Sequence, residues 1–150
     1  MSLTERESDL LTSADAIFPD ALAFVEDMVK TYAVLGREQA VLNCVESQMA
    51  YLGLPVTRVG MHKAQLAEHP LYAPVPWDHD SKYNLVSCLN PKAPGKTLVF
   101  NGHLDVVPAD PFDMWTLPPN EPWQYDGWLY GRGAGDMQAG VAAMIYAVHA

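Results

Sequence analysis

The sequence predicts an α/β fold in which a mixed β-sheet is flanked by helices. Apolar residues recur at helical spacing through the first 52 positions, β-type runs lie between 83 and 107, and a strongly apolar helical pattern fills 141–148. About half of the 150 residues are apolar (49%), which is enough for a hydrophobic core in one domain. These features exclude an intrinsically disordered chain.

Helical patterning dominates the first 36 residues. The tripeptide Phe18-Pro19-Asp20 predicts a break in the helix, with Asp20 as the N-cap of a new one. The apolar residues after it share one face: Leu22, Val25, Met28 and Val29.

A second helix is predicted from Arg37 to Leu52. Gly53 suits the position just after its end, and Pro55 prevents its continuation. Its apolar positions follow the three- and four-residue spacing of a packed face: Val41, Cys44, Val45, Met49 and Leu52.

The centre of the chain favours strands separated by turns. Short strands are expected at 56–59, at 84–89 and from 97 onward, and the turn-rich connection 90–96 predicts that the last two form an antiparallel pair. Asp126-Gly127 indicates a tight turn before 128–130. Proline-rich loops fill most of the region from 108 to 122.

Charge and composition exclude several classes of function. Nine basic residues against 18 acidic ones give a net charge of −9, which provides no basic face for nucleic acid and is repelled by an acidic membrane surface. No apolar run approaches the roughly 18–20 residues that span a bilayer, and the acidic N-terminus does not resemble a signal peptide. We therefore expect a cytoplasmic protein in which Cys44 and Cys88 are free thiols.

The segment from Asn101 to Pro108 carries the first candidate site. On a strand, His103 and Asp105 project from the same face, where the end of an apolar run meets a loop. An imidazole is a good zinc ligand, and a neighbouring carboxylate can accept its other N–H and fix the tautomer. The alternative is a His–Asp hydrogen bond with a purely structural role.

Asp136 is the second candidate, at the end of the glycine-rich stretch 131–135 and just before an apolar helix. The glycine spacing does not fit a dinucleotide-binding loop, and a phosphate-binding Gly-Lys-Ser/Thr sequence is absent. A carboxylate at this point can bridge two divalent ions, or it can simply cap the helix. A third cluster, Asp78-His79-Asp80, is better interpreted as a solvated loop than as a metal site.

The two segments GHLDVVP and DGWLYGRGAGDMQAG, in this order, closely resemble the metallopeptidase and deacylase family that includes acetylornithine deacetylase, succinyl-diaminopimelate desuccinylase, aminoacylase-1 and carboxypeptidase G2. The resemblance runs from about Asn84 to Ala150. It implies a zinc-peptidase-like catalytic domain, of which residues 1–150 are the N-terminal part.

Within this resemblance, His103 corresponds to a ligand of one metal, Asp136 to the carboxylate that bridges two metals, and Asp105 to the acid that orients His103. The Asp136–Met137 peptide is expected to be cis, and Arg132 is expected to have a structural role. The implied cofactor is a pair of zinc ions, with cobalt as an alternative. The implied reaction is metal-dependent hydrolysis of the amide bond of an N-acyl amino acid or small peptide.

The sequence departs from the family pattern Asp-Met-Lys-Gly-Gly at Gln138 and Ala139. The family also has a Glu-Glu pair, another acidic ligand and a final His, none of which occurs by Ala150. We therefore expect residues 1–150 alone to be inactive, and a homodimer is allowed only through a further domain. The alternative function is a non-catalytic metal-binding or scaffold protein of the same fold.

Overall fold

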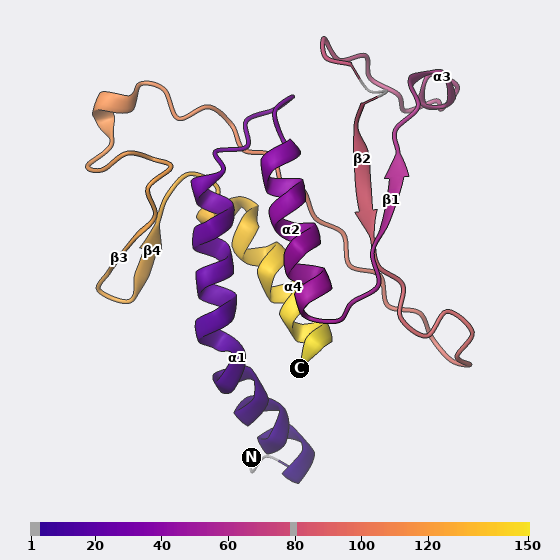
Figure 1. Cartoon of the computed structure of the whole chain (residues 1–150), viewed down its shortest axis with the longest axis vertical. Coiled ribbons are helices and arrows are strands. Elements are labelled where there is room, and N and C mark those ends of the chain that lie inside the picture. The colour runs from indigo at the N-terminus through magenta and orange to yellow at the C-terminus, as the bar shows by residue number, and fades with distance from the viewer. Residues whose placement is uncertain (1–3, 79–80) are drawn as a thin grey trace.

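Three helices form the centre of the computed structural model, which describes residues 4–78 and 81–150. Helices α1 (Glu5–Lys30), α2 (Gln39–Tyr51) and α4 (Ala139–His149) lie side by side, with a small β-sheet on one side and a β-hairpin on the other (Figure 1). The main buried residues of the core come from these helices: Phe24, Val25, Met28, Val29, Val41, Val45, Met49, Ala142 and Tyr146. The combination of helices and small β-sheets confirms the α/β class, although the described strands form two antiparallel pairs and not one mixed sheet.

Helix α1 runs without a break through Pro19, so the predicted helix start at Asp20 is wrong. The helix begins instead at Thr4, whose side chain accepts a hydrogen bond from the Glu7 backbone N–H while the Glu7 carboxylate binds the Thr4 N–H. Proline removes one helical hydrogen bond, to the carbonyl of Asp15. Both residues are exposed, so this carbonyl remains open to water and the helix tolerates the loss.

Helix α2 ends as predicted. Gly53 adopts a left-handed conformation (φ +73°), its N–H donates to the Ala50 carbonyl at 3.0 Å, and the Leu54 N–H donates to the Met49 carbonyl at 2.9 Å. This pair of hydrogen bonds is a Schellman motif, in which glycine avoids the steric penalty of a Cβ atom.

The predicted antiparallel pair between 84–89 and 97–100 does not form. Strand β2 (Tyr83–Val86) pairs instead with β1 (Thr57–Gly60), in antiparallel register with Thr57 opposite Val86. Between them lies the short helix α3 (Lys63–Leu66). Residues 97–100 have no strand partner within the described chain, and Leu98 and Val99 are 77% and 78% exposed. The turn residues at 90–96 form an open loop rather than a hairpin, and within the described chain the second edge of β2 has no partner strand.

The second sheet is the predicted hairpin. Strands β3 (Trp123–Tyr125) and β4 (Trp128–Tyr130) are joined by Asp126 and Gly127, which both have positive φ angles (51° and 78°). This is the backbone geometry of a two-residue hairpin turn. A 3₁₀ turn, η1 (Phe112–Met114), lies in the proline-rich loop before it.

Helix α4 confirms the predicted apolar helix. It follows directly on η2 (Ala134–Gln138), a wide helical turn in which Asp136 and Met137 depart from helical φ and ψ angles. Within 4–78 and 81–150, no helix is both long and apolar enough to cross a membrane.

Candidate metal centre

The segment that carries His103 packs closely against α4. A Cβ atom on Gly102 would lie 2.8 Å from the terminal methyl group of Met144 and 3.1 Å from Val141, so a larger residue would require the Met144 side chain to move. Just beyond, the Val106 N–H donates to the Ala33 carbonyl at 2.9 Å. The segment is extended but is not a strand of a sheet, with only an isolated parallel bridge between Val34 and Val106. The segment is therefore held by packing against α4 at Gly102 and by the backbone hydrogen bond at Val106.

The loop that carries Asp136 is fixed by a glycine and a backbone hydrogen bond. Gly133 has φ +90°, and a Cβ atom there would lie 2.5 Å from Val106 Cγ1. The Gln138 N–H donates to the Gly133 carbonyl at 3.0 Å and closes the turn. The Asp136–Met137 peptide is cis, as expected.

Asp136 does not cap the following helix. Its backbone is extended (φ −130°, ψ 100°), and the N-cap of α4 is Gln138, which makes no side-chain capping bond. The Asp136 side chain is 91% exposed, and its described polar contact is with His103. The structure therefore disfavours the helix-cap interpretation.

His103, Asp105 and Asp136 line one pocket of about 170 Å³, together with glycine backbone and Arg132. The His103 Nδ1 atom lies 3.1 Å from the Asp105 backbone carbonyl and 3.4 Å from its Oδ1 atom. Its Nε2 atom lies 3.2 Å from Asp136 Oδ1. The three residues predicted from the sequence are thus brought together.

This geometry favours a cation between His103 and Asp136. A carbonyl oxygen can only accept a hydrogen bond, so the His103 Nδ1 atom carries the ring proton and a neutral ring presents the Nε2 lone pair. That lone pair and an Asp136 oxygen then face each other as two acceptors, an arrangement that a proton or a metal ion stabilises.

The donor set fits a zinc-like ion. Ligand atoms at zinc distances of about 2.0–2.2 Å in tetrahedral geometry lie roughly 3.3–3.5 Å from each other. The 3.2 Å between Nε2 and Oδ1 is close to this separation. Two residues are fewer than the three or four protein ligands that zinc usually takes, and no group of three or more metal-binding side chains is found within the described part of the chain.

The other predicted cluster, Asp78-His79-Asp80, includes His79 and Asp80, which lie outside the described residues. The supporting contacts of the site are not evident from the sequence. The Gly102 approach to α4 and the side chain of Gln138, buried against Gly133, depend on residues from distant segments. The glycine immediately before His103 was the signal available for the first of these.

Residues 99–150 match the model of peptidase family M20/M25/M40. Over 128 residues the chain is 34% identical to a succinyl-diaminopimelate desuccinylase of Cereibacter sphaeroides, covering 85% of this chain and 29% of that protein. A shorter match of 50 residues is 62% identical to the enzyme of the same name from Herminiimonas arsenicoxydans, covering 33% of this chain and 13% of that protein.

Two solved structures share the fold. Human carnosine dipeptidase 1 superposes with a TM-score of 0.70 and 25% identity, covering 95% of this chain and 31% of that one. The dipeptidase Dug1p of Saccharomyces cerevisiae also gives a TM-score of 0.70, with 20% identity over 94% of this chain and 30% of that one. The chain thus spans about a third or less of the length of these relatives.

Proposed function

Because this chain belongs, through residues 99–150, to peptidase family M20/M25/M40, we propose that its protein is a metal-dependent hydrolase of amide bonds in N-acyl amino acids or small peptides. The observation that carries the proposal is the pair formed by His103 Nε2 and Asp136 Oδ1, 3.2 Å apart in the pocket. Residues 1–150 would be the N-terminal part of the catalytic domain.

Each of the three polar residues has a distinct role in this proposal. His103 offers its Nε2 lone pair to one ion, while Asp105 holds the ring through Nδ1. Asp136 presents an exposed carboxylate whose two oxygens can bind one ion each. When bound, two zinc or cobalt ions supply electrophilic activation of the scissile carbonyl and of a water molecule.

The remaining ligands and the general base would come from other residues of the protein, since two ligands do not complete a site. The rival proposal, a metal-binding or scaffold protein without turnover, uses the same three residues. The two differ in catalysis, not in metal binding, so an assay of hydrolysis separates them.

The test measures metal content and hydrolysis in the purified natural protein. We expect two divalent ions per chain, hydrolysis of N-acyl amino acids or dipeptides, and loss of activity on dialysis against a chelator. Asp136→Asn should lower metal content and activity together, because an amide cannot bridge two cations as a carboxylate does. Asp113→Asn, which changes an exposed carboxylate in η1, is the matched control.

Two results would overturn parts of the proposal. Two bound ions in the Asp136→Asn variant, with wild-type affinity, would exclude the bridging role. Full metal loading without hydrolysis of any acylated amino acid or peptide would favour the scaffold protein.

A further inference from the structure

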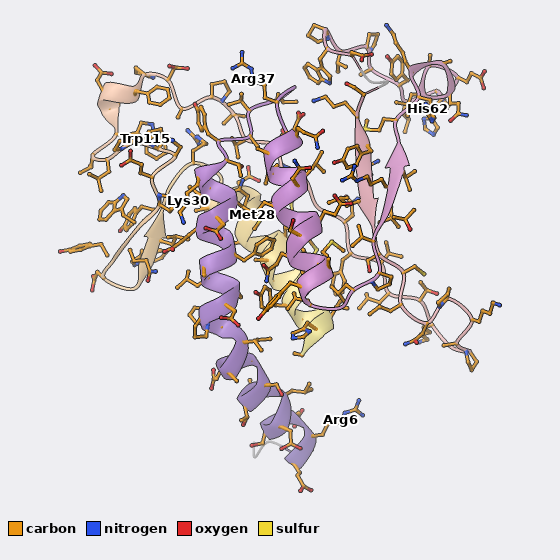
Figure 2. The ribbon with its side chains drawn as sticks, in the orientation of Figure 1. Arg6, Met28, Lys30, Arg37, His62 and Trp115 are labelled. Carbon is orange, nitrogen blue, oxygen red and sulfur yellow. The ribbon has the colours of Figure 1, made fainter. Side chains whose placement is uncertain are left out.

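Arg132 lies in a stacked arrangement beside the pocket. It follows β4, and its backbone N–H donates to the Pro119 carbonyl at 2.7 Å. Its guanidinium carbon lies 5.0 Å from the centre of the Trp115 ring. The Trp115 indole N–H donates in turn to the Ala109 carbonyl at 2.9 Å, and Ala109 is 2% exposed. Figure 2 shows Trp115 in the loop region beside the β3–β4 hairpin. The indole, held by its own hydrogen bond, therefore contacts the guanidinium through a cation–π interaction.

Among the residues that the structure describes, the guanidinium has no acidic partner. Within residues 4–78 and 81–150 it forms no ion pair or hydrogen bond, and its Nε atom is buried without an acceptor. Arg58, by contrast, makes two hydrogen bonds to the carboxylate of Glu46. The Nη1 and Nη2 atoms of Arg132 are not among the buried unpaired atoms, and the residue lines the pocket. A ligand in the pocket can therefore reach them and supply the acceptor that the described residues do not provide.

The position of Arg132 determines what this ligand can be. Arg132 lines the same pocket as His103 and Asp136, the residues assigned to the metal ions. Once cations are bound there, the arginine adds further positive charge instead of neutralising a carboxylate. The planar fork of a guanidinium matches a carboxylate with two parallel hydrogen bonds.

We propose that Arg132 is a specificity residue that binds a carboxylate of the substrate beside the metal centre. The inference rests on the proposed function, and it deepens that function by requiring an anionic substrate. The carboxylate could belong to the amino-acid part or to a dicarboxylic acyl group. Either source offers the same two oxygens to Arg132.

The test compares substrates that differ only in charge, using the purified, metal-loaded natural protein. N-Acetyl amino acids are compared with their carboxamides, and N-succinyl amino acid amides with N-butyryl amides. We expect wild type to prefer the charged member of one pair. Arg132→Met should raise KM for that member about 10–100-fold, the range for losing a hydrogen-bonded charge pair, and leave KM for the neutral member unchanged. The substrate pair in which Arg132→Met raises KM for the charged member identifies which part of the substrate carries the carboxylate.

Two further variants separate specificity from stability. Arg132→Lys keeps the charge without the fork and should recover part of the preference. Arg37→Met removes an exposed arginine at the start of α2, away from Trp115 (Figure 2), and should change neither KM. Metal content and thermal unfolding are measured for each variant, and succinate binding by calorimetry provides a readout that does not depend on turnover.

Equal losses for charged and neutral substrates in Arg132→Met and Arg132→Lys, or no charge preference in wild type, would overturn the proposal. If Arg132→Met does not fold, the preference of wild type for charged substrates and its reduction in Arg132→Lys still test the role of Arg132. If wild type hydrolyses none of these amides, the proposed function fails. Succinate binding then tests Arg132 separately, and equal affinity of wild type and Arg132→Lys would exclude the fork.

Discussion

His103 Nε2 lies 3.2 Å from Asp136 Oδ1, although 33 residues separate them in the sequence. Two glycines favour the contact, because Gly102 eases the approach of one segment to α4 and Gly133 lets the other segment turn beside Val106. The carboxylate and the imidazole are thus placed by backbone packing and not by their own attraction. This suits a metal site, whose ligands must be positioned before the ion arrives.

Asp105→Asn should weaken zinc binding about tenfold. The amide still contacts the His103 ring, but it lacks the negative charge of the carboxylate, which supports the ring as a metal ligand. Because the Asp105 backbone carbonyl remains bound to Nδ1, the ring keeps its orientation and the effect stays at the low end of the usual range. Zinc affinity is measured by competition with a chelator, with Asp126→Asn in the hairpin turn as control. Unchanged affinity would show that the backbone carbonyl alone orients the ring.

Gly133→Ala should destabilise the protein by about 2–5 kcal/mol. A left-handed conformation costs roughly 1–2 kcal/mol for a residue with a Cβ atom, and the clash with Val106 adds an overpacking cost of about 1–3 kcal/mol. Gly135→Ala is the matched control, because a Cβ atom there meets nothing within 4 Å. Chemical denaturation of both variants measures the difference. Similar stabilities would contradict the close packing at Gly133.

Local signals allowed much of the fold to be predicted. The Gly53 helix end and the Asp126-Gly127 turn each depend on a few neighbouring residues, and both are confirmed. The pairing of β2 with β1 instead of 97–100 was not predictable in this way, because it depends on which strand lies alongside in space. Helix α1 continues through Pro19 because Asp15, whose carbonyl loses its helical hydrogen bond there, is exposed to water. The sequence alone does not reveal this exposure.

The candidate site likewise has features that could be predicted from the sequence and features that could not. His103, Asp105 and Asp136 were predicted from motifs, and the structure brings them into one pocket. The stack of Arg132 on Trp115 escaped prediction, since a structural role was expected for this arginine and no spacing rule connects the two residues. Such contacts depend on how the proline-rich loop packs against the residue that follows β4.

Gln138→Met should leave stability unchanged or raise it by up to about 1 kcal/mol. Gln138 is 1% exposed. Among the residues that the structure describes, its Oε1 atom has no hydrogen-bond partner, and its Nε2 atom makes only a long 3.5 Å contact with the Met28 carbonyl. Removing an unsatisfied buried group eliminates its desolvation cost. The Met28 carbonyl is not orphaned, because Thr31 donates to it through both its N–H and its hydroxyl.

Urea denaturation measures this difference, with Gln124→Met as control. Gln124 is exposed and its amide donates to Glu26 at 2.8 Å, so its replacement removes a satisfied group. A loss of more than about 1 kcal/mol in Gln138→Met would mean that a water molecule or another partner satisfies Oε1 in solution.

Glu38 links the start of α2 to β2 and should make stability depend on pH. Burial alone would raise the pKa of its carboxyl, but hydrogen bonds from Lys82 and from the Gly36 N–H outweigh burial and lower the pKa below its usual 4.5. A lowered folded-state pKa means that the unfolded chain takes up the proton first as the pH falls. The stabilising contribution is therefore complete above about pH 4.5 and is lost as the pH falls through the lower, folded-state value.

Glu38→Gln should accordingly cost about 1–2 kcal/mol at pH 7, near the low end for a hydrogen bond to a charged group, since the Glu38 side chain is still 16% exposed. The difference from wild type should shrink as the pH falls below 4.5, because wild type then loses the same charge. Urea denaturation between pH 3 and about pH 7 measures both. Glu46→Gln, which removes an exposed partner of Arg58, should show a smaller change. If the stability difference between wild type and Glu38→Gln stays constant down to about pH 3, the shape of the Glu38 side chain stabilises the protein and its charge does not.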